Sequence, residues 1–194
     1  MYKRQQLYNL ELASLYFKKG NKEKYVDKLL SVLILKPDEK EEIQNQLQKE
    51  ARGKDKEIIE RAIYAHIQKY NHLKIFPELL LWYYLENRDY ESALIQSKAL
   101  DKRTVKSINK FASYAIKWNY TVSVAKHARD LKNYNQAIDI YKYVLTKSKE
   151  SNNKFNEILF RMDIADCKNE LVESTYPIDT NVCLLYTSPS PRDA

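Results

Sequence analysis

Glycine and long apolar runs are scarce in this chain. Its 194 residues include only two Gly, far fewer than average composition gives for this length. This scarcity argues against Gly-rich phosphate-binding loops, collagen-like repeats and β-sandwiches with many tight turns, all of which need glycine. No apolar run approaches the roughly 20 residues that a membrane-spanning helix needs. We therefore expect no membrane span.

The chain is rich in apolar, charged and tyrosine side chains. Hydrophobic residues make up 44% of it, which is enough for a core and is not typical of a disordered chain. It carries 33 basic and 26 acidic side chains, a net charge of +7, and 16 Tyr. Apolar residues recur at helical spacing almost throughout, and no convincing run alternates with the period of two that a strand shows. The sequence predicts an all-α fold, as one domain or a short repeat array.

Residues that end or cap helices divide the chain into short helices. Gly20 follows two lysines and ends the first helix, and Asn21 caps the second. Pro37 ends the second helix, and Gly53 ends the third. Later helices are predicted over residues 55–67, 75–86, 90–100, 104–117, 120–131, 136–147 and 154–171.

Both ends of the chain resemble translated sequencing-adapter sequence. This applies to residues 1–5 and to residues 183–194, where Ser-Pro-Ser-Pro cannot continue a helix. We exclude these ends from fold reasoning and expect residues 6–182 to be an internal fragment. A signal peptide, a lipid anchor and the compartment, either cytoplasm or cell envelope, therefore stay open. Without Cys183, Cys167 is the one cysteine left, so we expect no disulfide framework.

One segment in the C-terminal half resembles the second helix of a tetratricopeptide repeat (TPR). In that family a small residue is followed by an aromatic one four positions later, and by a small apolar one after three more. Ala137, Tyr141 and Val144 match these positions. In the helix before them, Val124 and Ala125 match a large and a small position. The sequence resembles TPR proteins of bacterial type with degenerate repeats.

The same pattern recurs along the chain. Copies that start at residues 6 and 74 lie 68 residues apart, which is twice the TPR length of about 34. A further copy starts at 118, after an expected insertion, and a partial copy follows. The expected repeat units span residues 6–39, 40–73, 74–107, 118–151 and 152–171, with a tail over 172–182.

The resemblance implies a right-handed α-solenoid of antiparallel helix pairs. Small residues such as Ala93 and Ala137 would lie where neighbouring helix pairs pack, and the first helix of each pair would line a concave side. TPR proteins usually bind peptides on that side. We therefore expect a non-catalytic scaffold or adaptor for another protein, part of a longer array, with no cofactor and no metal.

The resemblance also indicates candidate groove residues. They lie on the first helices of the units that begin at 74 and 118: Glu78, Trp82, Asn119, Val122, Lys126 and Arg129. Because Lys126 and Arg129 are three apart, they share a helix face and could hold an acidic peptide. The alternative is an ordinary charged surface, with Trp82 in the core.

Two other functions stay open. The excess of basic residues and the tyrosines could bind nucleic acid. The best candidate surface is a stripe of Lys98, Lys102, Arg103, Lys106 and Lys110. However, Lys and Glu alternate in most helices, which is typical of solvated helix faces and argues against this use. The chain could also be the docking module of an enzyme whose catalytic domain lies elsewhere in a longer protein.

Residue types that bind metals or act as nucleophiles lack the neighbours that those roles need. His66, His72 and His127 have no Cys or His at ligand spacing on their helices. Cys167 has no identifiable base or oxyanion site, and a buried apolar Cys is the usual case. We therefore expect no metal site and no turnover within these residues.

Two groups of carboxylates also have structural explanations. Glu39, Glu41 and Glu42 suit a helix N-terminus, where the macrodipole favours acids. Acid/base catalysis would instead need carboxylates that converge on a cleft in unequal environments. Asp163 and Asp166, on the last predicted helix, are expected in solvent.

Overall fold

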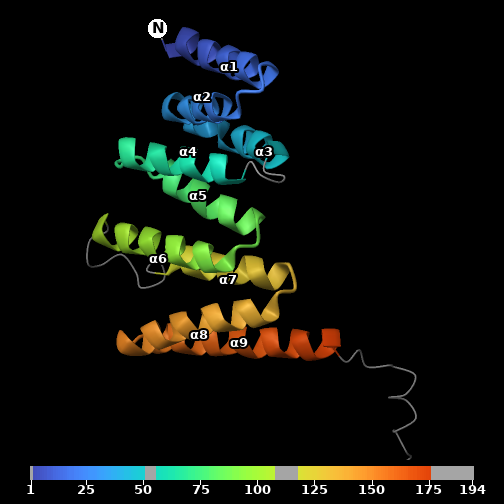
Figure 1. The fold of residues 1–194 in the computed structure, drawn as a ribbon. Helices are drawn as coiled ribbons and strands as arrows, with labels where there is room; N and C mark the ends of the chain where they lie inside the picture. The colour runs from blue at the N-terminus through green and yellow to red at the C-terminus, as the bar shows by residue number, and fades with distance from the viewer. Residues whose placement is uncertain (1, 51–55, 108–117, 176–194) are drawn as a thin grey trace, which may run out of the picture. The chain divides into compact units, whose positions relative to one another are not determined.

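The described part of the chain is helical. The computed structural model describes residues 2–50, 56–107 and 118–175. Within these ranges every regular element is a helix, so the predicted all-α fold is confirmed (Figure 1). The α-helices are α1 (Tyr2–Lys18), α2 (Lys22–Leu35), α3 (Lys40–Glu50), α4 (Lys56–Lys69), α5 (Ile75–Glu86), α6 (Tyr90–Ser107), α7 (Asn119–Asp130), α8 (Tyr134–Glu150) and α9 (Lys154–Thr175), and a 3-10 turn, η1 (Pro37–Glu39), precedes α3.

The chain divides into two compact bodies. The first body spans Met1–Leu100 and includes α1 to α5 with most of α6. The second body spans Asp101–Ala194 and includes the end of α6 with α7, α8 and α9. Every contact discussed below lies within one of these two bodies.

The predicted ends of the first helices coincide with the observed ones. α1 ends at Lys18, before Gly20. Asn21 caps α2, because its side-chain Oδ1 accepts a hydrogen bond from the Lys24 backbone N–H at 3.1 Å. α2 then ends before Pro37, which opens η1. The local signals of glycine, asparagine and proline therefore decide these ends.

Two other predicted ends were wrong. The sequence predicts a break between Leu100 and Thr104, but α6 runs unbroken from Tyr90 to Ser107, because no Gly or Pro interrupts it. α9 likewise continues past the predicted end at residue 171 and reaches Thr175. Residues 108–117 and the predicted helix end at Gly53 lie outside the described residues.

Four turns between helices share one backbone geometry. Each contains a residue with positive φ: Gly20 (71°), Arg88 (56°), Lys132 (60°) and Asn152 (51°). In each turn this residue donates its N–H to the carbonyl three positions back, and the next residue donates to the carbonyl five positions back. In the first turn, Gly20 donates to Phe17 O and Asn21 to Tyr16 O, both at 2.9 Å. This is the Schellman motif, which satisfies the last carbonyls of a helix.

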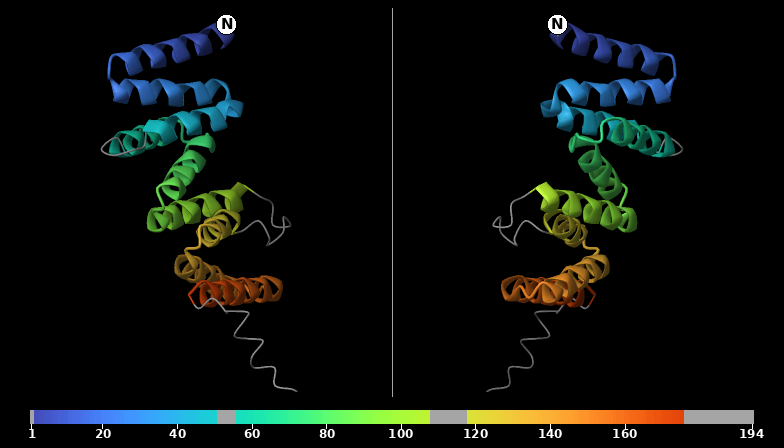
Figure 2. Two further views of the ribbon diagram at one scale, coloured as in Figure 1. Left: turned by 90° about the vertical axis from the view of Figure 1, so that its right-hand side faces the viewer. Right: turned by 90° about the vertical axis from the view of Figure 1, so that its left-hand side faces the viewer.

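Two pairs of consecutive helices in the first body, α1 with α2 and α4 with α5, pack antiparallel. The Tyr83 hydroxyl, late in α5, donates to the Lys56 carbonyl at the start of α4 at 3.0 Å. Phe76, early in α5, stacks near His66, late in α4, with ring centroids 5.1 Å apart. The pair α1 and α2 lies side by side in the same way (Figure 2), with Phe17 and Tyr25 at 5.2 Å across the turn.

Helices that are next but one in the chain run parallel. In the first body, Glu23 of α2 lies 3.9 Å from Arg61 of α4, and Gln48 of α3 donates to Glu86 of α5 at 2.7 Å. The partners are 38 residues apart in both pairs. In the second body, Arg129 of α7 pairs with α9 over a similar sequence separation. Regular spacing of this kind is what a helical repeat produces.

Small residues lie in the core, as the sequence predicts. Ala93, Ala125 and Ala137 are fully buried, and Ala13 is nearly so. Without bulk at these positions, neighbouring helix backbones can approach closely. The larger Tyr141 is also fully buried and lies near Phe160 of α9, with ring centroids 6.4 Å apart. Small and aromatic residues together therefore fill the core of the second body.

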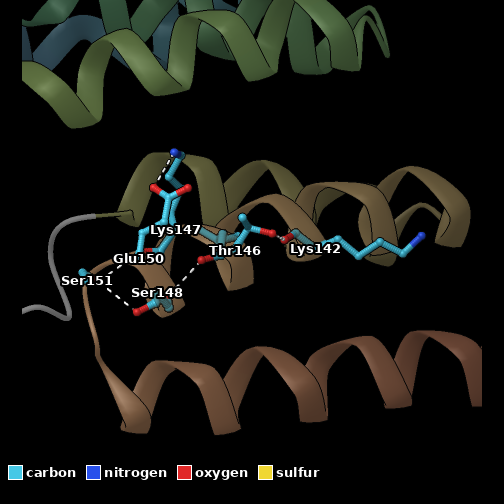
Figure 3. Close-up of polar contacts among 7 residues, drawn as sticks. Lys142, Thr146, Lys147, Ser148, Glu150 and Ser151 are labelled. Carbon is cyan, nitrogen blue, oxygen red and sulfur yellow. Dashed lines mark hydrogen bonds and ion pairs between the residues drawn. The ribbon is translucent and has the colours of Figure 1, made fainter.

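Hydroxyl side chains satisfy carbonyls at the end of α8. Ser148 donates to Val144 O at 2.9 Å, and Ser151 donates to Lys147 O and to Ser148 O, both at 3.0 Å (Figure 3). Lys147 pairs with Glu150 at 2.6 Å on the same last turn. These bonds complete the end of the helix ahead of the Asn152 turn.

Candidate functional site

A groove of about 620 Å³ lies between the parallel helices α3 and α5 in the first body. This volume is in the range of pockets that bind small molecules or side chains. Among its lining residues are four from α3 and three from α5: Glu42, Asn45, Gln48, Lys49, Trp82, Tyr83 and Glu86. Trp82, which the TPR resemblance assigned to the inner face of the repeat, is among these lining residues.

The amphipathic pattern of α3 brings its polar side to the groove. Ile43 and Leu47, four residues apart, are buried on the other side of the helix. Glu42, Asn45 and Lys49 follow helical spacing on the open side, since residues three and four apart share a face. Glu42 also lies in the first turn of α3, where the helix dipole favours an acid.

On α5, a row of three residues at four-residue spacing faces α3. Glu78, Trp82 and Glu86 form this row. The residues beside the row, such as Phe76 and Leu80, are fully buried and fix the helix in place. Trp82 is half-buried and lines the groove.

Two polar bridges hold α3 and α5 together. Near the N-terminal ends, Lys40 Nζ lies 3.4 Å from Glu78 Oε2. Near the C-terminal ends, Gln48 Nε2 donates to Glu86 Oε2 at 2.7 Å. Trp82 lies one helical turn from each acidic residue of α5. The predicted groove residue Glu78 therefore neutralises Lys40 at one end of the helix pair.

Two tyrosines of α5 hold the helix in place, and one of them, Tyr83, also lines the groove. Tyr83 is buried and donates to the Lys56 carbonyl, and burial together with the charge of Glu60 raises the pKa of Tyr83 to about 12. Tyr84 donates to Glu60 Oε1 at 2.6 Å, and burial raises its pKa as well. Both hydroxyls therefore stay protonated near neutral pH and hold α4 against α5.

The groove carries unneutralised negative charge. Glu42 accepts from Gln46 Nε2 at 2.9 Å, and Glu86 accepts from Gln48. Both donors are neutral amides, and within the described residues neither carboxylate lies within ion-pair distance of a cation. Among the described residues that line the groove, Lys49 is the one basic side chain, beside the two carboxylates of Glu42 and Glu86.

The predicted groove residues on α7 lie in the second body. Asn119 and Lys126 are exposed, and Val122 and Arg129 are half-buried. The Arg129 guanidinium is already occupied: its Nε lies 3.1 Å from both carboxylate oxygens of Glu170, and its Nη2 also bonds to Glu170. This pairing raises the pKa of Arg129 and lowers that of Glu170.

Carboxylates of α9 face the basic residues of α7. Asp166 lies 3.7 Å from Arg129 Nη2. Asp163, expected in solvent, is instead half-buried. Its pKa is raised by burial, and the charges of Arg129 and Lys126 oppose this rise. Arg129 therefore joins α7 to α9, and no local signal indicates this partner because it lies about forty residues downstream.

The histidines and the cysteine occupy different parts of the structure. His66 is buried, its Nδ1 bonds to the Ala62 carbonyl at 3.0 Å, and its Nε2 lies 3.8 Å from Asp27. His72 is exposed in the turn after α4. Cys167 is fully buried, and burial raises the pKa of its thiol. Across residues 2–50, 56–107 and 118–175, no group of three or more His, Cys, Asp and Glu side chains is arranged to hold a metal ion.

Sequence reasoning missed two sets of polar residues. The first is the α3 side of the groove, since Glu42 was attributed to the helix dipole alone. The second is Asp101, a carboxylate that is almost fully buried. It accepts from Thr121 Oγ1 at 2.6 Å and from the Tyr120 N–H at 3.0 Å. Asp101 thus caps α7. In the sequence, the only sign of this role is an acidic residue at a position where the helical pattern requires an apolar one.

The basic stripe proposed for nucleic acid is only partly described. Lys102 and Arg103 are exposed on α6, and Lys98 is half-buried. The side chain of Lys106 and all of Lys110 lie outside the described residues.

Among the helices of the described ranges, none combines the length and apolar character needed to cross a membrane.

Comparison with known proteins gives no family. No family model matches the chain, and no curated protein or solved structure matches it.

Proposed function

We propose that this chain is a TPR-like helical repeat that acts as a non-catalytic scaffold and binds an extended peptide segment of another protein. The repeat is degenerate and of the bacterial type. Its binding surface includes the groove between α3 and α5, and Trp82 is the central contact residue.

The regular geometry of the turns and helices supports a repeat. Arg88 follows Gly20 by 68 residues, twice the TPR length, and both occupy the same position in the same turn motif. Side chains 38 residues apart pair between α3 and α5. A repeat period of about 34 residues places equivalent positions on α3 and α5. The observed pairs are 38 residues apart, so each residue of α3 pairs with a residue of α5 about one helical turn beyond its equivalent position. The ranges 6–39, 40–73, 74–107 and 118–151 each contain two α-helices.

The groove between α3 and α5 is the observation that carries the proposal. In the repeat frame these helices are the first helices of successive units, which is where the TPR resemblance expects peptide binding. The groove has the volume for a side chain and the polar groups to orient it. A half-buried Trp at such a site is typical of residues that dominate binding energy.

The chemistry of several side chains argues against the other functions. Glu42 and Glu86 would repel a phosphate backbone at this site. The buried Cys167 thiol and the high-pKa tyrosines are poor nucleophiles and poor bases near neutral pH. We therefore propose peptide binding rather than nucleic-acid binding or catalysis.

A peptide array tests the proposal. The full chain is labelled and applied to an array of random 12-residue linear peptides, and bound peptides are then measured in solution. The Trp82→Ala variant should lose about tenfold or more in affinity. Ile95→Ala, which removes an exposed apolar residue of α6 in the same body, should bind like the wild type.

Helical content of each variant is checked by circular dichroism. If no peptide binds, or if Trp82→Ala binds every selected peptide as well as the wild type does, the proposed function is wrong.

A further inference from the structure

We infer that the groove between α3 and α5 accepts the guanidinium group of an arginine side chain, stacked on Trp82. This inference rests on the proposed function and specifies the ligand chemistry at that site. The opposite expectation, an acidic peptide, came from Lys126 and Arg129. Arg129 is engaged with Glu170 and Asp166 in the second body.

The groove offers several hydrogen-bond acceptors. Asn87, which follows α5 and lines the groove, donates its side-chain N–H to the Tyr83 carbonyl at 2.8 Å. Gln48 donates its side-chain N–H to Glu86. In both amides the carbonyl oxygen is thus left to accept, beside the carboxylates of Glu42 and Glu86. A guanidinium carries five N–H groups and no acceptor, so it can donate to several of these oxygens at once.

The end of α5 adds to the negative potential. α5 ends at Glu86, which lines the groove, so the last turn of this helix borders the site. The dipole of a helix places about half a negative charge at its C-terminus, which favours a cation there. At the opposite end of the groove, Glu78 is already paired with Lys40.

The aromatic ring selects a flat cation. Trp is the strongest cation–π partner, and an arginine guanidinium stacks on its face while still donating in its own plane. A lysine ammonium has only three donors and loses more hydration when it leaves water. Lys49 opposes the cation, since it is the basic residue of the lining. The charge of Lys49 should therefore weaken arginine binding. Removal of this charge should strengthen binding, whereas removal of a groove carboxylate should weaken it.

The test uses a small probe and the full chain. N-acetyl-arginine N-methylamide is titrated against ¹⁵N-labelled protein, with the matching citrulline compound as the neutral isostere. The chain has two Trp residues, so the indole N–H spectrum has one signal from Trp82 and one from Trp118. Trp118 lies outside the groove, and Trp118→Phe assigns the signals. The arginine probe should shift the Trp82 signal with a millimolar Kd, about tenfold tighter than citrulline.

Charge variants separate a local site from general attraction. Glu86→Gln should weaken the arginine probe about threefold to tenfold, and Lys49→Gln should strengthen it about twofold to threefold. Glu91→Gln, which removes an equal charge from the exposed start of α6, should have no effect.

The inference is overturned if the arginine probe leaves the Trp82 signal in place, if citrulline binds as well, or if Glu91→Gln acts like Glu86→Gln. Peptides that bind the groove without preferring arginine over citrulline would leave the proposed function standing and remove only this inference.

Discussion

Single residues in the turns hold backbone conformations that side chains disfavour. Gly20 has a φ of 71°, and a Cβ added there would meet no atom within 4 Å. The penalty for a larger residue is therefore conformational rather than steric crowding with neighbours. Arg88 and Lys132 accept the same penalty with full side chains, at φ of 56° and 60°.

Substitutions at these positions should change stability in opposite directions. We expect Gly20→Ala to lower the free energy of unfolding by about 1 kcal/mol, because Ala disfavours positive φ. We expect Lys132→Gly to raise it by up to about 1 kcal/mol, because Gly relieves that strain. Urea unfolding measures both. A more stable Gly20→Ala together with a less stable Lys132→Gly, or no change in either variant, would contradict the turn geometry.

Buried His66 should make stability depend on pH. Burial lowers the pKa of His66 below its usual 6.5, and the hydrogen bond to Ala62 and the charge of Asp27 offset this only in part. Lys69 and Lys28 lower it further. As the pH falls, the unfolded chain therefore takes up the proton first. The contribution of His66 to stability is present above pH 6.5 and is lost as the pH falls through the lowered pKa.

Unfolding by urea at pH 8, 7, 6 and 5 measures this loss. His66→Gln should flatten the decline below pH 6.5, whereas His72→Gln, a change in an exposed turn, should leave it unaltered. A wild-type profile retained in His66→Gln would assign the decline to other groups.

At the scale of one helix, α7 depends on a distant cap. Its own N-cap residue, Trp118, makes no side-chain cap bond. The buried carboxylate of Asp101 accepts from the backbone N–H groups of Tyr120 and Thr121 instead, at 3.0 and 3.1 Å. These are among the first N–H groups of the helix, which have no partner within it.

Removal of this cap should destabilise the second body. Asp101→Ala leaves buried donors unsatisfied and should lower the free energy of unfolding by about 2 kcal/mol. Asp101→Asn keeps one acceptor oxygen and should cost less. Thermal unfolding followed by circular dichroism compares the two variants. An alanine variant as stable as the asparagine variant would show that the cap bonds contribute nothing.

The sequence predicted the helices better than their partners. Gly20, Asn21 and Pro37 act on their immediate neighbours, so their effects could be predicted locally. Trp82 was predicted as a groove residue because the repeat frame gives each first helix one exposed row. The α3 side of the groove and the ion pair of Arg129 with Glu170 depend on which helices meet, and no local signal records that. The continuous α6 was missed because polar residues after Leu100 resemble a turn.

At the scale of the whole chain, α9 exposes apolar side chains. Phe155 is 69% exposed, Ile158 60% and Met162 58%, and their spacing places them on one face with Leu159. A helix that is apolar on two faces is usually covered on both. An exposed row of this size marks a surface that associates.

We expect the chain to self-associate at micromolar concentrations through this row. The double change Phe155→Ser and Met162→Gln should shift sedimentation velocity profiles toward the monomer. Val172→Ser, at a similarly exposed site about three turns further along α9, should leave association unchanged. A wild-type chain that stays monomeric at all concentrations would contradict this expectation.

The shared turn motif has a consequence for how such a chain can change in length. The junctions at Gly20, Arg88, Lys132 and Asn152 have the same hydrogen-bond pattern despite four different neighbourhoods. A tandem duplication or deletion that cuts at equivalent points of two such junctions would rejoin the backbone in a conformation the chain already uses. Gene rearrangement between the Gly20, Arg88 and Lys132 junctions could therefore add or remove helices in pairs without inventing a new connection.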